Sequence, residues 1–184
     1  MTNFEEKTIN KKVIFDGKVL KLEVHDVELT DGSTSMRELV YHKGAVAILA
    51  VTDKDEVLLV EQYRKAVEQM TLEIPAGKLD PGEERMECAI RELAEETGYH
   101  AKKENVKKMY DTHLAIGYSS ELISVFVVEN LSDEDRGELA LDEDEFINVK
   151  KYKLEDAFKL LDDNVITDSK TLLALEWLRN KRRV

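Results

Sequence analysis

Three glutamates have the spacing at which carboxylates act together. Glu92, Glu95 and Glu96 stand at positions i, i+3 and i+4, which places them on one side of an α-helix that turns by about 100° per residue. Like charges this close repel and raise one another's pKa values. A hard divalent cation such as Mg2+ or Mn2+, bound through oxygen, would neutralise them. For this spacing alone a solvated acidic face is the ordinary interpretation, and a metal site is the alternative that the surrounding residues must decide.

The same stretch predicts the helix that must position these glutamates. Apolar or weakly polar residues recur at helical spacing on an adjacent face, which we expect to pack in a core: Met86, Ala89, Ile90, Leu93 and Thr97. Residues 80–83 read DPGE, which has the form of a turn or of a helix cap with proline at N1. Either form predicts a helix that begins shortly after Pro81. Cys88 lies inside this helix, where we expect packing and not reactivity.

The fixed positions around the glutamates resemble the signature of the Nudix hydrolase family. Gly77, Glu83 and the run RELAEETG at 91–98 fill every invariant position of that signature, and Tyr99 stands where the family usually has an aliphatic residue. The resemblance implies hydrolysis of a nucleoside diphosphate linked to another group, with a divalent metal. It assigns Glu92 and Glu96 as the main metal ligands, with Glu95 nearby and the backbone carbonyl of Ala76 completing the site. Glu96 is also counted among the catalytic residues.

Arg91 stands directly beside the carboxylates. We interpret it as an organising residue that pairs with a glutamate such as Glu83, and not as a substrate clamp. A purely structural salt bridge is the alternative for both residues.

Further segments resemble the ADP-ribose pyrophosphatase branch of the family: 37–38, 42–46, 61–64, 73–77 and 141–147. The branch implies Arg37, Arg64 and Glu73 as substrate contacts. A guanidinium binds phosphate oxygens through two hydrogen bonds, so Arg64 is the preferred phosphate clamp. A surface ion pair at the end of a strand is the alternative for Arg64. Phe15 and Tyr63 have rings that could stack on adenine, but core packing is the expected role of both.

Two loops complete the site that this resemblance implies. In residues 115–121, Gly117 and Glu121 match the branch, whereas Ile116 replaces the expected proline and leaves the preference among ADP-sugars open. In the acidic loop 142–145, the branch uses a mobile glutamate that activates the attacking water or supports a metal. Glu143 is the first choice for this role and Glu145 the second, while a merely solvated loop is the alternative.

The pattern of strands and helices predicts an α/β protein with the Nudix fold, in which a mixed β-sheet is sandwiched between helices. Residues 1–43 alternate as strands of a small antiparallel sheet that is too small to be stable alone. The resemblance implies that this sheet is exchanged between two subunits of a homodimer. Residues 44–184 would form the hydrolase domain, with closing helices at 154–162 and 168–180. Lys170 and the basic residues 179–183 are interpreted as solvated charges at a helix C-terminus.

Composition limits the partners. A net charge of -12 argues against a nucleic-acid-binding surface or an anionic membrane partner. The single cysteine excludes an intramolecular disulfide and suits a reducing compartment. The first residues contain no apolar signal segment, so a cytoplasmic location is expected.

We therefore expect an enzyme that splits the pyrophosphate of ADP-ribose or a related nucleoside diphosphate sugar with Mg2+, for which Mn2+ can substitute. The products would be AMP and a sugar phosphate. A family member acting on nucleoside triphosphates or dinucleoside polyphosphates is the nearest alternative. A non-catalytic ADP-ribose sensor is less favoured because all three helix glutamates are present.

Overall fold

The computed structural model describes residues 4–141 and 146–182. The chain divides into two compact units, each of which is described by itself. The first unit combines Met1–Gly44 with His113–Leu122, and the second combines Ala45–Thr112 with Ile123–Val184. The sequence did not predict that the segment at 113–122 would group with the N-terminal strands.

The first unit is built on a three-stranded antiparallel sheet in the order β1-β2-β3. Its strands are β1 (Lys7–Asp16), β2 (Leu20–Glu28) and β3 (Thr34–His42). Gly32 has φ +81 in the turn between β2 and β3, a conformation that glycine adopts without strain. The edge of β3 pairs with the returning segment through the parallel bridge between Val40 and Ser119. The predicted N-terminal strands are therefore confirmed.

The second unit contains a seven-stranded sheet, in which β10-β5-β4-β9-β8 form the main path while β6 pairs with β5 and β7 with β4. Its strands are β4 (Ala45–Thr52), β5 (Glu56–Arg64), β6 (Gln69–Glu73), β7 (Ala76–Lys78), β8 (Lys107–His113), β9 (Leu122–Leu131) and β10 (Ile147–Lys153). The central strand β4 pairs in parallel with β9 and antiparallel with β7. Every residue of β4 is buried, as a strand covered on both faces requires.

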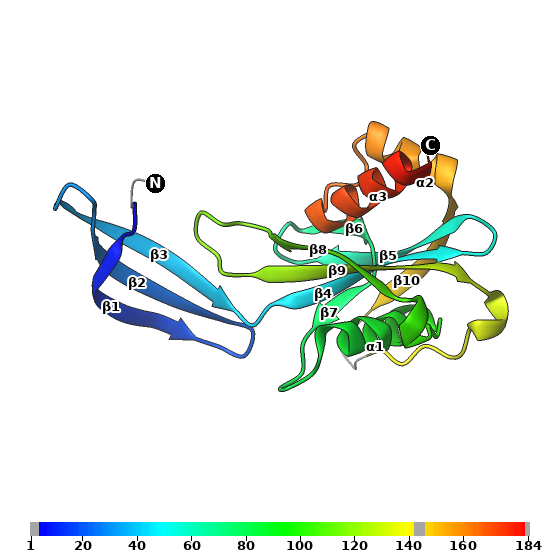
Figure 1. Ribbon diagram of the computed structural model, residues 1–184, viewed down its shortest axis with the longest axis horizontal. Coiled ribbons are helices and arrows are strands. Elements are labelled where there is room, and N and C mark those ends of the chain that lie inside the picture. The colour runs from blue at the N-terminus through cyan, green and yellow to red at the C-terminus, as the bar shows by residue number, and fades with distance from the viewer. Residues whose placement is uncertain (1–3, 142–145, 183–184) are drawn as a thin grey trace. The chain divides into compact units, whose positions relative to one another are not determined.

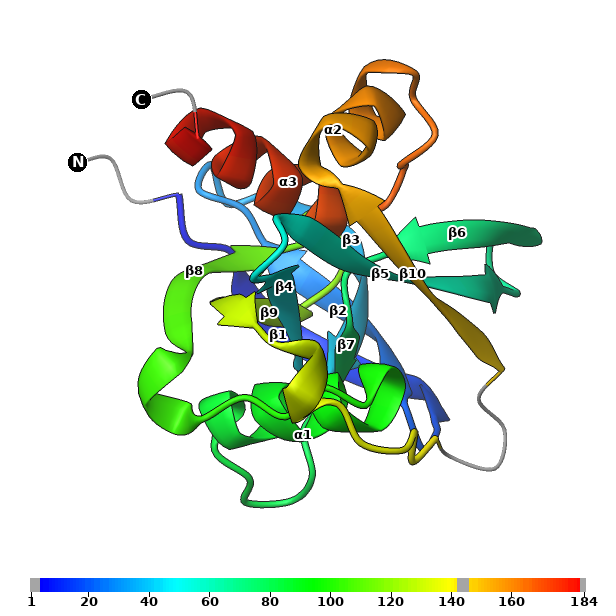
Figure 2. The same cartoon turned by 90° about the vertical axis from the view of Figure 1, so that its right-hand side faces the viewer.

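Helices cover both faces of this sheet (Figures 1 and 2). α1 (Arg85–Thr97) lies on one face, and α2 (Leu154–Asp162) and α3 (Ser169–Arg182) lie on the other. Alternate residues of β4 point to opposite faces: Ile48 belongs to the core under α1, and Leu49 to the core under α2 and α3. The mixed sheet between helices that the sequence predicts is therefore confirmed. In the described part of the chain, every helix is too short or too polar to cross a membrane.

The C-terminal helices largely follow their predicted bounds, but one interpretation is wrong. Lys170 lies in the first turn of α3, not at a C-terminus, and is only 5% exposed. Asp168 caps the helix by accepting the backbone N–H of Thr171 at 3.0 Å. A buried lysine needs a partner of opposite charge, and its partner belongs to the candidate site.

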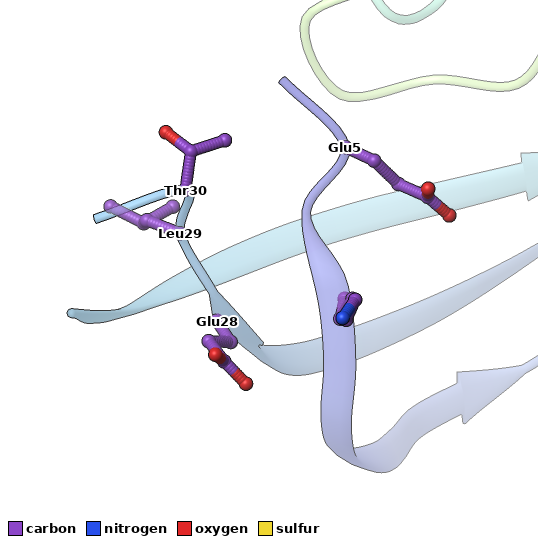
Figure 3. Close-up of a pocket in the computed structure, with 5 residues that line it drawn as sticks. Glu5, Glu28, Leu29 and Thr30 are labelled. Carbon is purple, nitrogen blue, oxygen red and sulfur yellow. The ribbon is translucent and has the colours of Figure 1, made fainter. Parts of the chain in front are cut away.

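A small pocket in the first unit lies beside the ends of β1 and β2 (Figure 3). Its lining residues are Glu5, Lys7, Glu28, Leu29 and Thr30. None of them is among the residues predicted to bind metal or substrate.

Candidate active site

The segment before α1 is a turn that the backbone and the side chain of Glu83 both stabilise. The backbone N–H of Glu83 donates to the Asp80 carbonyl at 3.1 Å, and the Glu83 carboxylate accepts the Asp80 N–H at 3.0 Å. α1 begins only at Arg85, and its N-cap residue Glu84 makes no side-chain cap bond. Of the two forms considered for residues 80–83, the turn is therefore correct and the proline-first helix cap is wrong. Gly98 ends α1 with φ +77, and its N–H donates to the Ala94 carbonyl.

Two of the three helix glutamates are buried on the inner side of α1. Glu92 is 8% exposed and Glu96 is 3% exposed. Glu96 accepts the backbone N–H of Ala76 at 3.0 Å, which joins the helix to strand β7. The side chain of Glu95 is 35% exposed. Glu92 and Glu96 therefore belong to the buried edge, whereas Glu95 is more exposed but shares the Nη1 donor of Arg91 with Glu92. The assignment of Glu95 to the metal site stays a prediction.

Gly77 makes the position of Glu92 possible. A Cβ atom at Gly77 would lie 1.8 Å from Cδ of Glu92 and 2.0 Å from Oε1. Atoms that are not bonded do not approach so closely, so any side chain at position 77 would displace the carboxylate. The glycine is needed here for space, since its backbone φ does not require glycine.

Arg91 connects the turn to the carboxylates. Its Nε and Nη2 donate to the two carboxylate oxygens of Glu83 at 2.8 and 2.9 Å. Its Nη1 donates to Glu92 at 2.9 Å and to Glu95 at 2.7 Å. These bonds from Arg91 are the main reason that the pKa of Glu83 is lowered to about 2. The predicted pair of Arg91 and Glu83 is confirmed.

A second ion-pair network lies at the end of β6. Glu73 is 3% exposed and accepts hydrogen bonds from both Nε and Nη2 of Arg64 at 2.7 Å. The Nζ of Lys170 donates to the same carboxylate at 2.5 Å. Burial by itself raises the pKa of Glu73, but Arg64 and Lys170 outweigh it and lower the pKa to about 2. In this structure Arg64 is paired with Glu73, and an ion pair was the alternative to phosphate binding. The role of Arg64 as a phosphate clamp stays a prediction.

The remaining predicted substrate contacts belong to the first unit. Arg37 makes a two-bond pair with Glu6 at 2.9 and 2.6 Å. Glu121 lies 3.5 Å from Nδ1 of His42, and a Cβ at Gly117 would meet open space. Ile116, which replaces the expected proline, is 82% exposed. The assignments of Arg37, Gly117 and Glu121 stay predictions.

Two other residues of the signature have structural roles. Cys88 is fully buried, and burial is the main reason that its pKa is raised to about 12, so the predicted packing role is confirmed. Tyr99 is also fully buried, and its hydroxyl donates to Asp133. Asp133 in turn holds Lys54 and Lys151 at 2.6 and 2.5 Å. An aromatic residue fits at position 99 because its polar end finds an acceptor beyond the apolar core.

The donor set at the buried edge suits a hard divalent cation. Glu92, Glu96 and the carbonyl of Ala76 supply only oxygen, as Mg2+ and Mn2+ prefer, and the absence of a side chain at Gly77 leaves room for the carboxylate. Within 4–141 and 146–182, no group of three or more acidic, histidine or cysteine side chains is arranged to hold a metal ion. The assignment of Glu92, Glu96 and the Ala76 carbonyl as metal ligands therefore stays a prediction. Glu143 and Glu145 lie outside the described residues.

Sequence reasoning missed Lys170 and Thr171 as parts of this region. Thr171 is fully buried, and its hydroxyl accepts the backbone N–H of Ile74 at 2.8 Å. Both residues contact segments 97 positions earlier in the chain. Nothing in the local pattern of α3 signals such contacts.

Comparison with known proteins identifies the family. A NUDIX domain matches residues 41–175. The chain is 49% identical over 182 residues to a protein named ADP-ribose pyrophosphatase from Bacillus subtilis (strain 168), which covers 98% of this chain and 96% of that protein. It is 44% identical over 176 residues to a methanol dehydrogenase activator from Bacillus methanolicus, covering 96% of this chain and 94% of the relative. A crystal structure of an ADP compounds hydrolase superposes with a TM-score of 0.83 at 25% identity and covers 100% of both chains. The chain belongs to the Nudix family.

Proposed function

We propose that this protein hydrolyses the pyrophosphate bond of ADP-ribose or a related nucleoside diphosphate sugar, with Mg2+ as the metal and Mn2+ as a substitute. The observation that carries the proposal is the pair of buried carboxylates, Glu92 and Glu96, held against Ala76 and Gly77. Nudix hydrolases in general need a divalent metal. The similarity to the ADP-ribose pyrophosphatase from Bacillus subtilis supports the substrate class.

In this mechanism Glu92, Glu96 and the Ala76 carbonyl would hold the metal, with Glu95 nearby. The metal would neutralise charge on the two phosphates and lower the pKa of a bound water. Arg64 binds phosphate oxygens, and Glu143 takes the proton of the attacking water. Water adds to one phosphorus, the bridging oxygen leaves with the other phosphate, and the products are AMP and a sugar phosphate.

The proposal includes a homodimer, because the first unit leaves much apolar surface uncovered. No residue of β1 is buried. Ile9, Ile14 and Phe15 on this strand are 57%, 50% and 56% exposed. The expectation of core packing is therefore wrong for Phe15, and also for Tyr63, which is 52% exposed. An exposed apolar strand usually marks an interaction surface. Analytical ultracentrifugation should detect a dimer at micromolar concentration, and a monomer there would contradict this part of the proposal.

A substrate panel tests the proposed reaction. ADP-ribose, other nucleoside diphosphate sugars, nucleoside triphosphates and a dinucleoside polyphosphate are incubated with Mg2+ or Mn2+, and release of AMP and phosphate is measured. We expect AMP from ADP-ribose and no activity after chelation of the metal. In Glu96→Gln, the amide oxygen still accepts the Ala76 N–H, so folding is retained while metal binding and turnover are lost. Cleavage of triphosphates alone would favour the alternative substrate class.

A further inference from the structure

Every acceptor position of the Glu73 carboxylate is occupied. Oε1 accepts from Nε of Arg64 and from the hydroxyl of Thr71, both at 2.7 Å. Oε2 accepts from Nη2 of Arg64 at 2.7 Å and from Nζ of Lys170 at 2.5 Å. Two cations therefore share one buried carboxylate. Lys170 also pairs with Asp168, so the charges balance while Arg64 stays in place, and the question is what pairs Glu73 when Arg64 moves.

The two cations differ in their freedom to move. The side chain of Arg64 is 42% exposed, whereas that of Lys170 is 7% exposed. Lys170 is also bound to Asp168 at 3.0 Å, and Asp168 is fixed because it caps α3 through Thr171. Arg64 can turn away from Glu73 toward solvent or a ligand, but Lys170 cannot.

Arg64 is also within electrostatic range of the buried metal edge. Its pKa is raised chiefly by the hydrogen bonds to Glu73, and the negative charges of Glu73, Glu96 and Asp168 add to the rise. A diphosphate bound to a metal ion at Glu92 and Glu96 would therefore compete with Glu73 for the Arg64 guanidinium. If Arg64 moved, a Glu73 without another partner would become an uncompensated buried charge, which is strongly unfavourable.

We propose that Lys170 is a positioning residue that holds the charge of Glu73 while Arg64 leaves this carboxylate to bind the substrate diphosphate. The inference rests on the proposed function, in which Arg64 is the phosphate clamp. Lys170 touches neither substrate nor metal in this role and acts only through Glu73. Because Lys170 belongs to α3, the C-terminal helix contributes to substrate affinity without contacting the substrate.

The contacts of the neighbouring backbone support this role of α3. Thr171 accepts the N–H of Ile74, the Pro75 carbonyl accepts the N–H of Ile48 at 2.9 Å, and Ala76 donates to Glu96. The backbone from 73 to 77 is therefore held in place on both sides. When Arg64 moves, Glu73 cannot follow it. The negative charge of Glu73 must therefore be paired by another residue at its present position.

The test compares Lys170→Met with Lys170→Arg and with the matched control Lys181→Met. Lys181 lies on the same helix, where it pairs with Glu129 and is 43% exposed, so the control removes the same charge from the same element. The dissociation constant of a non-hydrolysable α,β-methylene analogue of ADP-ribose is measured by calorimetry with Mg2+, together with KM and kcat for ADP-ribose. The Nε–H resonance of Arg64 in NMR spectra reports whether the arginine leaves Glu73.

We expect Lys170→Met to weaken analogue binding and raise KM by at least about tenfold, with a smaller change in kcat. Lys170→Arg should retain most of the affinity, and Lys181→Met should bind like the wild type. The Arg64 resonance should shift on binding in the wild type. The decisive variant is Glu73→Gln combined with Lys170→Met, in which position 73 no longer carries a charge that needs a partner. It should regain much of the affinity lost in Lys170→Met.

Three outcomes would overturn the inference. The first is equal binding by Lys170→Met and the wild type, and the second is an Arg64 resonance that does not shift on binding. The third is a double variant that recovers no affinity. That third result would indicate that Lys170 contacts the substrate directly or is purely structural. A Lys170→Met protein that does not fold leaves the double variant and Lys170→Arg as the test. A wild type that neither binds the analogue nor hydrolyses ADP-ribose would instead overturn the proposed function and the inference with it.

Discussion

The carboxylate of Glu92 occupies the space in which a side chain at Gly77 would begin, with only 1.8 Å between its Cδ and a Cβ built on the glycine. The two residues lie on α1 and β7, so this contact determines how closely the helix approaches the strand. The same approach brings Glu96 to the N–H of Ala76. The invariant glycine of the signature is thereby explained by the position of the Glu92 carboxylate, which we propose as a metal ligand.

Gly77→Ala should reduce kcat by about 100-fold, because a displacement of about 1 Å in a catalytic group has that effect. The matched control is Gly82→Ala. At Gly82 a Cβ meets nothing within 4 Å, but φ is +81, so the control strains the backbone and leaves Glu92 alone. Steady-state kinetics and thermal unfolding of both variants separate the two effects. Equal activity in the two variants would contradict the role assigned to Gly77.

Arg91→Lys should weaken metal binding by about 10- to 100-fold, as loss of groups that orient metal ligands does. Lysine carries one ammonium group and cannot replace the two bonds to Glu83 together with those to Glu92 and Glu95. Titration with Mn2+, followed by electron paramagnetic resonance, measures the effect. Lys103→Met, which breaks an exposed pair with Glu87, should bind Mn2+ like the wild type. An unchanged affinity in Arg91→Lys would assign Arg91 a structural role only.

The pairing of Glu83 with Arg91 should make the free energy of unfolding depend on pH in the acidic range. Arg91 lowers the pKa of Glu83 from 4.5 to about 2, so between these values the unfolded state binds more protons and stability rises with pH. The contribution is complete above pH 4.5 and is lost as pH falls toward 2. Urea unfolding of the wild type and Glu83→Gln should therefore show a difference that shrinks from pH 5 downward. A difference independent of pH would be inconsistent with this pairing.

Tyr99→Phe should lower the free energy of unfolding by about 1.5–3 kcal/mol, since it removes a hydrogen bond to a charged acceptor. For a chain of this length each kcal/mol corresponds to about 2–4 °C in Tm. Asp133 keeps Lys54 and Lys151 as partners, so kcat should stay within about twofold of the wild type. The exposed Tyr118 provides the control substitution to phenylalanine. An unchanged Tm in Tyr99→Phe would show that the hydroxyl is not needed.

Glu143→Gln should reduce kcat by a factor of about 100 to 10,000 with little change in binding, as removal of a general base does. Glu145→Gln is the comparison, because both residues belong to the same acidic loop. Single-turnover kinetics with ADP-ribose separates the chemical step from binding. If Glu143→Gln barely changes the rate, the base is Glu145 or one of the helix carboxylates.

Local patterns were sufficient for the parts of the site that lie within one stretch of chain. The spacing of Glu92 and Glu96 follows from the helical repeat, and the pair of Arg91 and Glu83 joins residues only eight positions apart. The sheet between helices also followed from short apolar runs. These features depend on interactions between near neighbours, which the sequence displays directly.

Tertiary structure alone decided which charges are buried and what each one faces. Nothing near Lys170 in the sequence announces that it will be buried against Glu73, 97 residues earlier, or that Glu95 will turn toward Arg91 and solvent while Glu92 enters the space beside Gly77. Such contacts form only when α1 and α3 pack against opposite faces of the same sheet. Burial removes water from these groups, so each buried charge must then find its partner within the protein.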